Sequence, residues 1–419
     1  VSTAKPKVQL GQIPISKLNS QGSPTIAITP FCRLDHFSMA LNHPAVHHEG
    51  WAQRRGVANQ IKCAILAAGL GKRLEPLTAR HLPKPLFPLG GKVPLAELWV
   101  RNMVAAGITD ISMNLCVLAE TIERHFADGS HWGAKIRYIH ETVPSGTLGG
   151  ICKQALGREA KTFAQEQPLA LEPFRGSTLI APSGDVVTNF NSALLEEMYD
   201  IHTRASAAFT MVLVPVPWER RKDFGTVVLE DIQDRKGQIS RSGRISAFRE
   251  KDPDSPSNLN NASIYMIEMD LLRELDALRT PARVDVPQPF YDFGKHVFPA
   301  MLKQLPYAKL SRDYLLQGVE YDGTWFDVGQ KRDYLEVHRQ LLDGEIDATL
   351  PFEKQPWGYV GTNSNIHPRA KIVAPVVIGN GCVIEEDPTV GPYAVIGDGW
   401  TVGHGATVKN SVLWESYPY

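Results

Sequence analysis

The chain has 419 residues, of which 43% are hydrophobic and 21% are charged, and its formal net charge is −1. This composition is typical of a globular protein with a sizeable core. The balanced charge argues against a nucleic-acid partner. No apolar run approaches the ~18 residues of a membrane-spanning helix, so we expect no membrane partner. The five cysteines form no CxxC pair, so we expect neither a zinc site nor a disulfide framework, and we expect a cytoplasmic protein.

Residues 1–60 contain scattered prolines and no sustained periodicity, which predicts a poorly ordered N-terminal extension. Residues 61–345 then alternate strand-like and helix-like stretches. The first strands are expected at 61–68, 111–115 and 136–139, with helices between them at 96–106 and 119–126. This order predicts βαβ units around a parallel sheet.

A second strand-rich part follows within residues 61–345. Its strands are expected at residues 208–214, 225–229, 245–248 and 262–267. Residues 346–360 contain two prolines and a glycine and are expected to form a linker to the C-terminal part.

Aliphatic residues recur every six positions in residues 361–419. They are Ile366, Ile372, Ile378, Ile384, Val390, Ile396, Val402 and Val408. This period predicts the hexapeptide repeat of a short left-handed parallel β-helix whose aliphatic residues point into the core. With three hexapeptides in each coil, the tail supplies fewer than three coils. An uncovered final coil would expose apolar surface, so we expect a truncated chain or a coil covered by a partner subunit, in a homo-oligomer.

The strand at residues 61–68 runs into Gly69-Leu70-Gly71, and the cations Lys72, Arg73 and Lys84 follow. Open sheets bind ligands at the carboxyl ends of their strands, where a turn of small residues followed by cations suits a phosphate. The stretch is neither a dinucleotide fingerprint nor a Walker loop, because Leu74 stands at the third glycine position and no GK[ST] follows.

The pattern G-x-G-x-R-x-x-P-L-T, with P-K-P further on, resembles the sugar-1-phosphate nucleotidylyltransferases over residues 61–345. The hexad tail is similar to the longer members of that family. The resemblance implies a Rossmann-like, GT-A-like domain with a mixed or parallel sheet. It also implies catalytic roles for Arg73, Lys84, Asp185 and Lys251. The nucleotide-binding residues it implies are Leu66, Ala68, Gly69, Gly71, Lys72, Arg73, Glu141 and Gly146.

The segment ETVPSGTLGG, residues 141–150, resembles the base-binding segment of the family. Glu141 stands where a side chain would meet the base. A carboxylate only accepts hydrogen bonds, and the guanine edge offers two adjacent donors, so this residue favours GTP. Some uridylyltransferases of the superfamily also carry glutamate here, and Leu148 departs from the usual alanine, so the base stays open.

Two aspartates stand in contexts that resemble the metal ligands of the family. Asp185 follows an apolar strand in LIAPSGDVVTN, where Ser183 replaces the usual asparagine, and Asp327 lies in TWFDVGQ. The resemblance implies that Asp185 and Asp327 hold one Mg²⁺. Mg²⁺ takes few protein carboxylates and completes its octahedron with waters and phosphate oxygens, which agrees with this set.

Three further segments, DFGTVVLED, RISAFREKDPD and NNASIYMIE, resemble the sugar-side blocks of the family. They imply a sugar-phosphate site formed by Gly225, Glu250, Lys251 and Asn261. Ser263 replaces the usual glycine and is expected to narrow the sugar pocket.

The reaction these features imply is Mg²⁺-dependent nucleotidyl transfer from a nucleoside triphosphate to a sugar 1-phosphate. GTP and mannose 1-phosphate are favoured. The alternatives are a glucose-1-phosphate uridylyl-, adenylyl- or thymidylyltransferase, and a non-catalytic paralogue that senses a nucleotide-sugar. A hexapeptide acyltransferase would need more coils and a catalytic histidine.

Overall fold

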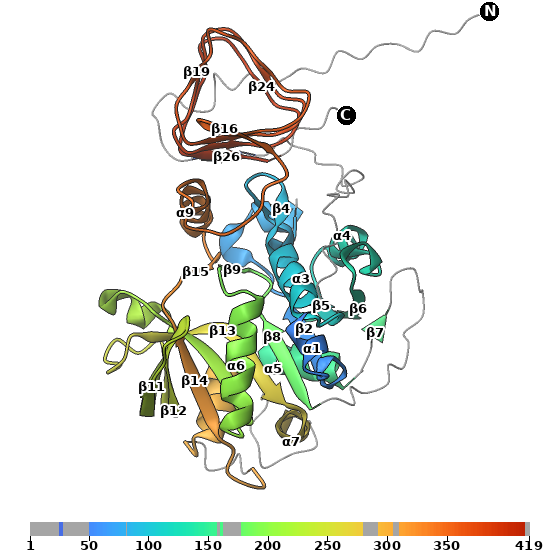
Figure 1. Ribbon diagram of the computed structural model, residues 1–419, viewed down its shortest axis with the longest axis vertical. Coiled ribbons are helices and arrows are strands. Elements are labelled where there is room, and N and C mark those ends of the chain that lie inside the picture. The colour runs from blue at the N-terminus through green and yellow to red at the C-terminus, as the bar shows by residue number, and fades with distance from the viewer. Residues whose placement is uncertain are drawn as a thin grey trace, which may run out of the picture.

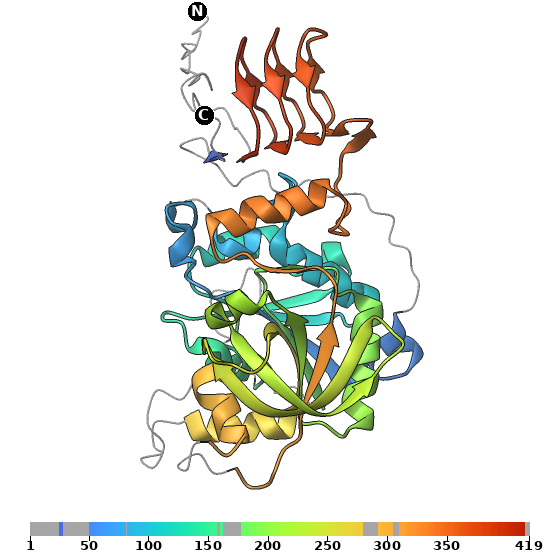
Figure 2. The ribbon, with the colours of Figure 1, turned by 90° about the vertical axis from the view of Figure 1, so that its left-hand side faces the viewer.

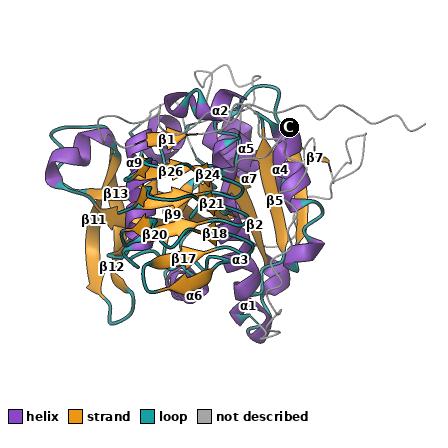
Figure 3. Ribbon diagram, turned by 90° about the horizontal axis from the view of Figure 1, so that it is seen from above, coloured by secondary structure: helices purple, strands orange, loops and turns teal. Residues whose placement is uncertain are grey.

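The structure is a computed structural model that describes residues 25–27, 50–80, 82–156, 160–161, 177–279, 292–304 and 310–414. Its main part is built around a large mixed sheet, and a stack of short strands lies above it (Figure 1). Figure 3 shows the same arrangement from above. Among the described residues, no helix combines the length and apolarity needed to cross a membrane.

One side of the large sheet is parallel. Its strands run in the order β8 (Thr178–Pro182), β2 (Ile61–Leu66), β5 (Asp110–Leu115) and β6 (Lys135–His140), with β7 (Ala160–Lys161) antiparallel at the edge. The sequence predicts β2, β5 and β6 from their apolar runs, because both faces of a parallel sheet are covered. In β2, Cys63 and Ile65 belong to one hydrophobic cluster and Ala64 to a second one.

Helices cover both faces of this sheet. The first cluster includes residues of α3 (Leu95–Ala106) and α6 (Ser192–Arg204), and also of α4 (Ala119–Phe126). The second includes residues of α5 (Gly146–Ala155), α7 (Met269–Arg279) and α8 (Phe298–Met301). The helices predicted at 96–106 and 119–126 are confirmed as α3 and α4.

The second strand group is largely antiparallel. It contains β10 (Phe209–Pro215), β11 (Gly225–Asp234), β12 (Ile239–Glu250), β13 (Leu259–Glu268) and β14 (Leu316–Tyr321). Strand β13 pairs with both β8 and β10 and so joins this group to the parallel strands. The four predicted strands of this group are confirmed, and β11, β12 and β13 extend beyond their predicted bounds.

Short elements complete the main part. They are α1 (Trp51–Arg54), η3 (Ala58–Gln60), η4 (Lys72–Leu74), α2 (Leu77–Arg80), η5 (Lys84–Leu86), β3 (Pro88–Leu89), β4 (Val93–Pro94), η6 (Ser130–Trp132), β9 (Val186–Thr188), η7 (Trp218–Asp223), η8 (Phe293–Val297), β15 (Trp325–Asp327) and α9 (Lys331–Leu342).

The folded part begins before the boundary that the sequence predicts. Trp51 is only 2% exposed and stacks near Tyr199, with ring centroids 5.3 Å apart. The prediction of a poorly ordered segment is therefore wrong for residues 50–60. Strand β1 (Thr25–Ala27) pairs in parallel with the last strand of the C-terminal stack (Figure 2). The rest of the predicted extension lies outside the described residues.

Residues 358–413, here called the coil stack, form parallel ladders on three sides of a triangle (Figure 1). Asn365 pairs with Val383, and Val383 with Thr401, so each coil takes 18 residues on this side. The six hexad residues from Ile378 to Val408 are buried, and Ile366 and Ile372 are partly buried against the same cluster. The inward placement that the six-residue period predicts is present.

The strands of the coil stack are short. They are β17 (Gly358–Val360), β18 (Asn365–Ile366), β19 (Lys371–Ile372), β20 (Val376–Ile378), β21 (Val383–Ile384), β22 (Thr389–Val390), β23 (Ala394–Ile396), β24 (Thr401–Val402), β25 (Thr407–Val408) and β26 (Ser411–Leu413). The predicted linker at 346–360 is a packed segment: Ile346 and Leu350 are buried, and β16 (Glu353–Gln355) pairs with β17.

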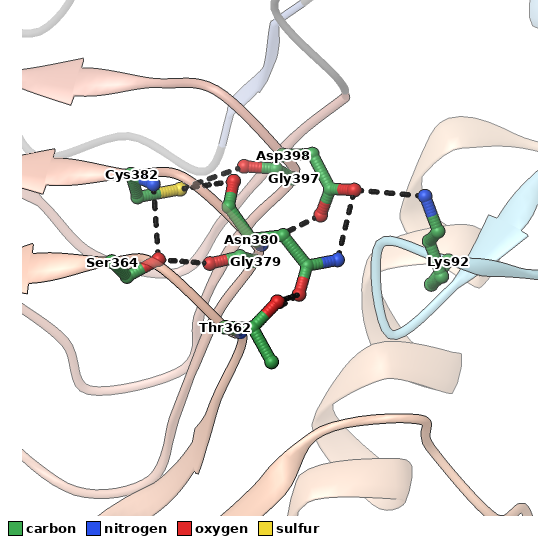
Figure 4. Close-up of polar contacts among 8 residues, drawn as sticks. All are labelled: Lys92, Thr362, Ser364, Gly379, Asn380, Cys382, Gly397 and Asp398. Atoms are coloured by element: carbon green, nitrogen blue, oxygen red, sulfur yellow. Dashed lines mark hydrogen bonds and ion pairs between the residues drawn. The ribbon is translucent and has the colours of Figure 1, made fainter. Parts of the chain in front are cut away.

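A ladder of polar side chains at one corner of the coil stack ends on the main part (Figure 4). Asn380 Oδ1 accepts hydrogen bonds from the backbone and hydroxyl of Thr362, at 2.8 and 3.1 Å. The carboxylate of Asp398, in the next coil, accepts from the backbone and amide of Asn380 and pairs with Lys92 at 2.8 Å. Lys92 lies in the β3–β4 turn, so this turn is tied to the coil stack.

Helix α9 holds the same hairpin from another side. The Tyr334 hydroxyl donates to the Pro88 carbonyl at 2.7 Å and accepts from Trp414 Nε1 at 3.1 Å. Nδ1 of His338 bonds to the Tyr334 carbonyl at 2.8 Å, while Nε2 accepts the Gly90 N–H at 3.1 Å. Nε2 also lies 3.2 Å from the Pro88 carbonyl, which favours a protonated ring, but burial outweighs this contact and lowers the pKa of His338 to about 4.

This histidine predicts acid sensitivity. Because the folded-state pKa lies below the ordinary value of 6.5, the unfolded chain binds the proton first, and stability falls as pH drops from about 6.5 to about 4. We expect a loss of up to ~3 kcal/mol from this residue. Urea unfolding at several pH values measures it, and His338→Gln should flatten the slope between pH 6.5 and 5. Equal slopes in both proteins would contradict the assignment.

Candidate active site

A cavity of about 1040 Å³ lies over the second strand group and is also lined by Arg73, from the loop after β2, and by Asp327 of β15. The ends of β2 and β8 are joined by a hydrogen bond, since the Gly184 N–H donates to the Leu66 carbonyl at 2.9 Å. Among the residues that line the cavity are Arg73, Thr147, Gly225, Glu250, Lys251, Asn260, Asn261, Ser263, Tyr265, Asp292, Trp325 and Asp327.

Lys84 joins two carboxylates that are far apart in the sequence. Its ammonium group forms an ion pair with Asp185 and another with Asp327, the latter at 3.2 Å. Strand β15 pairs with β9 so that Asp327 stands opposite Val186, the residue after Asp185. This register brings together the two aspartates that the sequence pairs.

The charges of this triad are strongly coupled. Burial alone would lower the pKa of Lys84, but Asp185 and Asp327 outweigh it and raise that pKa. Burial opposes ionisation of Asp185 too, yet Lys84 and the Ser183 hydroxyl, 2.5 Å from Oδ1, hold its pKa below the usual range. Burial raises the pKa of Asp327, helped by the charge of Asp185. Two carboxylates share one ammonium, so the ionised triad is negative and attracts a further cation.

Arg73 lies against this triad. A Cβ on Gly329, two residues after Asp327, would stand 2.9 Å from Arg73 Nη2, so a larger residue there would make the guanidinium shift. Gly71 has φ +61°, and a Cβ on it would meet Thr78 Cγ2 at 2.6 Å. The loop after β2 is therefore shaped by backbone requirements, and it leaves Gly69 and Lys72 exposed.

Glu141 occupies a different environment from the one that the sequence suggests. The side chain is 4% exposed; Oε1 accepts from Asn114 Nδ2 at 2.8 Å. Oε2 accepts from the backbone and hydroxyl of Ser145, at 2.6 and 2.7 Å. Asn114 in turn accepts the Ala67 N–H at 2.8 Å, which fixes the end of β2 between Leu66 and Ala68.

This arrangement leaves Glu141 little capacity for a base. Oε2 already accepts two hydrogen bonds, so the carboxylate cannot use both oxygens equally for two donors of a guanine edge. Gly146, with φ +71°, begins α5 directly after Ser145. The geometry supports a role for Glu141 in holding the loop after β2 and the start of α5.

The sugar-side residues line one wall of the cavity. Gly225 pairs with Glu250 across β11 and β12, and a Cβ on Gly225 would stand 2.9 Å from Glu250 Oε2. A Cβ on Gly294 would stand 2.6 Å from the same oxygen. The carboxylate therefore lies in a slot between two glycines, where burial raises its pKa. Lys251 follows it and is exposed to the cavity.

Asn261 is partly engaged within the protein. Its Nδ2 donates to the Tyr265 hydroxyl at 2.9 Å, and its Oδ1 accepts the Ser263 N–H at 2.9 Å. The neighbouring Asn260, which the sequence analysis did not select, is 2% exposed and also lines the cavity. Its Nδ2 has no hydrogen-bond partner among the described residues, so it is a donor available to a ligand.

Several other residues of the site belong to no motif that marks them in the sequence. Asp292, Trp325 and Gly329 carry no separate signal, although Trp325 and Gly329 stand in the W-x-D-x-G context of Asp327. Asn114 ends a strand and becomes meaningful only through its contact with Glu141. Asp185 and Asp327 are the acidic pair; among the described residues no group of three or more His, Cys, Asp or Glu could hold a metal ion.

The chain is similar to proteins of a known family. The pattern of the family described as "Nucleotidyl transferase" matches residues 62–344, more than half of the chain. The chain belongs to the nucleotidyl transferase family. It is an enzyme of the sugar-1-phosphate nucleotidyltransferase type, a family that acts on nucleoside triphosphates and sugar 1-phosphates.

Individual relatives differ in their substrates. The chain is 28% identical to a UTP–glucose-1-phosphate uridylyltransferase of Synechocystis sp., over 85% of this chain and 83% of that protein. It is 28% identical to a mannose-1-phosphate guanylyltransferase of Mycobacterium tuberculosis, over 84% of each. It is 27% identical to a glucose-1-phosphate adenylyltransferase of Geobacillus stearothermophilus, over 82% of each.

A solved structure supports the fold. The crystal structure of a putative glucose-1-phosphate thymidylyltransferase from Bacillus anthracis aligns with a TM-score of 0.50 and 18% identity, covering 70% of this chain and 98% of that one. Similarity at this level concerns the fold alone.

The hydrogen bonds of Glu141 predict how replacing this residue changes the stability and the KM of the enzyme. In Glu141→Gln, one of the acceptor oxygens becomes an NH₂ group facing the Asn114 or Ser145 donors, so we expect a loss of ~1–3 kcal/mol in the free energy of unfolding. The KM for the nucleoside triphosphate should rise, because the loop after β2 loses support. The ratio of kcat/KM among different triphosphates should not change.

The control is Glu120→Gln on the exposed face of α4, which should leave stability and KM unaltered. A change in base preference in Glu141→Gln would show instead that Glu141 reads the base directly.

Proposed function

We propose that this enzyme transfers a nucleotidyl group from a nucleoside triphosphate to a hexose 1-phosphate and releases pyrophosphate. The observation that carries the proposal is the convergence of Asp185 and Asp327 on Lys84, beside Arg73, at the edge of one cavity. A phosphate oxygen of the sugar 1-phosphate forms a bond to the α-phosphorus, and the bond from that phosphorus to the pyrophosphate oxygen breaks.

For this reaction the protein mainly has to position the substrates and stabilise negative charge. The attacking phosphate oxygen is anionic near neutral pH, so no side-chain base has to remove a proton. Two anions must approach each other, and charge increases at the five-coordinate phosphorus. Arg73 would neutralise the triphosphate, Lys84 would stabilise the reacting phosphoryl group, and Lys251 would align the attacking phosphate.

The acidic pair fits a divalent cation. Asp185 and Asp327 supply carboxylate oxygens, and the triad with Lys84 keeps a negative charge. This donor set suits Mg²⁺, which binds one or two carboxylates together with substrate phosphates. Asp185 and Asp327 would hold the ion, which would supply charge neutralisation to the phosphates.

The identities of the nucleotide base and of the sugar are a separate part of the proposal. The sequence favours GTP and mannose 1-phosphate, the pair named for the relative from M. tuberculosis. UTP with glucose 1-phosphate, as named for the Synechocystis protein, is the second candidate. The contacts of Glu141 weaken the case for GTP, because they remove the bidentate guanine match on which it rested.

For the C-terminal part we infer a left-handed parallel β-helix. The 18-residue repeat and the three ladders of the coil stack support it. The proposed setting is a cytoplasmic homo-oligomer that associates through this part, with neither nucleic acid nor membrane as a partner.

The test is a pyrophosphate-release panel that crosses the nucleoside triphosphates with several hexose 1-phosphates, with and without Mg²⁺. We expect turnover that depends on Mg²⁺. Asp185→Asn and Arg73→Ala should each lower kcat by ~10²–10³, as removal of a single charge-stabilising group does elsewhere.

Arg249→Ala provides the matched control, because this arginine is exposed on β12 beside Glu250 but does not line the cavity. It should keep the activity of the unmodified enzyme. Near-normal turnover in Asp185→Asn or Arg73→Ala would contradict the roles assigned, and binding of nucleotide-sugar without any turnover would support a regulatory paralogue instead.

A further inference from the structure

Two residues without glycine's freedom adopt left-handed backbone conformations on the sugar side of the cavity. Lys251 has φ +53° and Ser263 has φ +59°. Such conformations are unfavourable for residues with a Cβ and persist where the surrounding structure enforces them, often at functional sites. Of the two, Ser263 also has a backbone hydrogen bond to Ser183, in the turn that carries Asp185.

The neighbours of Ser263 hold it in this conformation. Its N–H donates to Asn261 Oδ1 at 2.9 Å, and its carbonyl accepts the Ser183 N–H at 3.0 Å. This second bond continues the ladder between β13 and β8 beyond the last pair, Ile264 with Pro182. The backbone at Ser263 is therefore attached both to a sugar-side residue and to the turn after β8 that carries Asp185.

This attachment places Ser263 between the two parts of the site. On one side is Ser183, whose hydroxyl donates to Asp185 Oδ1 at 2.5 Å. On the other side are Asn261 and Tyr265, which line the sugar wall. The reacting phosphate has to lie near Asp185 and Lys84. The part of the hexose that passes Ser263 is then the part next to the anomeric carbon.

We propose that Ser263 is a specificity-determining residue that reads the configuration at carbon 2 of the hexose 1-phosphate. This inference rests on the proposed function. The hydroxymethyl group of Ser263 occupies space that glycine would leave open. Its hydroxyl interacts with the Tyr265 hydroxyl, and its remaining hydrogen-bonding capacity is open to a hydroxyl of the sugar. An axial hydroxyl and an equatorial hydroxyl at carbon 2 point in different directions, so they cannot form the same contact with Ser263.

The test compares kcat/KM for three substrates in the unmodified enzyme, Ser263→Gly and Ser263→Ala. Glucose 1-phosphate and mannose 1-phosphate differ at carbon 2, and galactose 1-phosphate differs from glucose 1-phosphate at carbon 4. In Ser263→Gly the preference between the carbon-2 epimers should fall at least tenfold, while the carbon-4 preference should stay within twofold. Ser263→Ala keeps the Cβ and should show a smaller change in the same direction.

Thermal unfolding shows that the variants fold. Ser263→Gly should raise the Tm, because glycine adopts φ +59° without the penalty of a Cβ. An unchanged carbon-2 preference in both variants would overturn the proposal, and so would an equal loss of both preferences, which indicates general loosening of the cavity. An unmodified enzyme that turns over none of the sugar phosphates would overturn the proposed function together with this inference, whereas an active enzyme with unaltered preference overturns the inference alone.

Discussion

The contact of one lysine with two aspartates organises this molecule. Lys84, Asp185 and Asp327 come from three distant segments, and Lys84 is only 7% exposed. A buried ammonium without partners would lose its proton or destabilise the fold, and two neighbouring carboxylates without a cation would repel each other. Lys84 therefore favours the ionised form of both carboxylates and they favour its charge, while Asp185 opposes the ionisation of Asp327. The triad forms only when β9 pairs with β15 and when the segment after β2 brings Lys84 to the two aspartates.

The polar residues around the triad act through position more than through direct chemistry. Gly329 lets Arg73 approach, and Gly225 with Gly294 makes a slot for Glu250. Glu141 holds Asn114 and Ser145, and Asn114 holds the backbone after β2. A carboxylate in a motif can thus have a structural role even where the motif itself belongs to the active site. Strand ends become a binding surface only after such contacts fix them.

The sequence predicts the central elements well, because buried apolar runs and a six-residue period leave little choice. It predicts the site residues through motifs that stand next to strand ends. The sequence does not predict burial that depends on distant partners. Trp51 packs against α6, and Leu350 packs against the β3–β4 turn, although both lie in segments of low periodicity. Helix α9 had a usable signal, since Tyr334, Val337, His338 and Leu341 are buried with helical spacing. The contact of Glu141 with Asn114 had no signal, since the two residues are distant in sequence.

The hairpin after Lys84 connects the chemistry to the C-terminal part. Pro88, four residues after Lys84, accepts the Tyr334 hydroxyl, and Tyr334 in turn accepts from Trp414 at the end of the coil stack. Lys92 in the same hairpin pairs with Asp398 (Figure 4). Val377, Val395 and Val412 of the coil stack belong to the same hydrophobic cluster as α3 and β2. The coil stack is therefore part of the structure that supports Lys84, because the segment bearing that lysine lies between the sheet and the stack and has polar contacts to both.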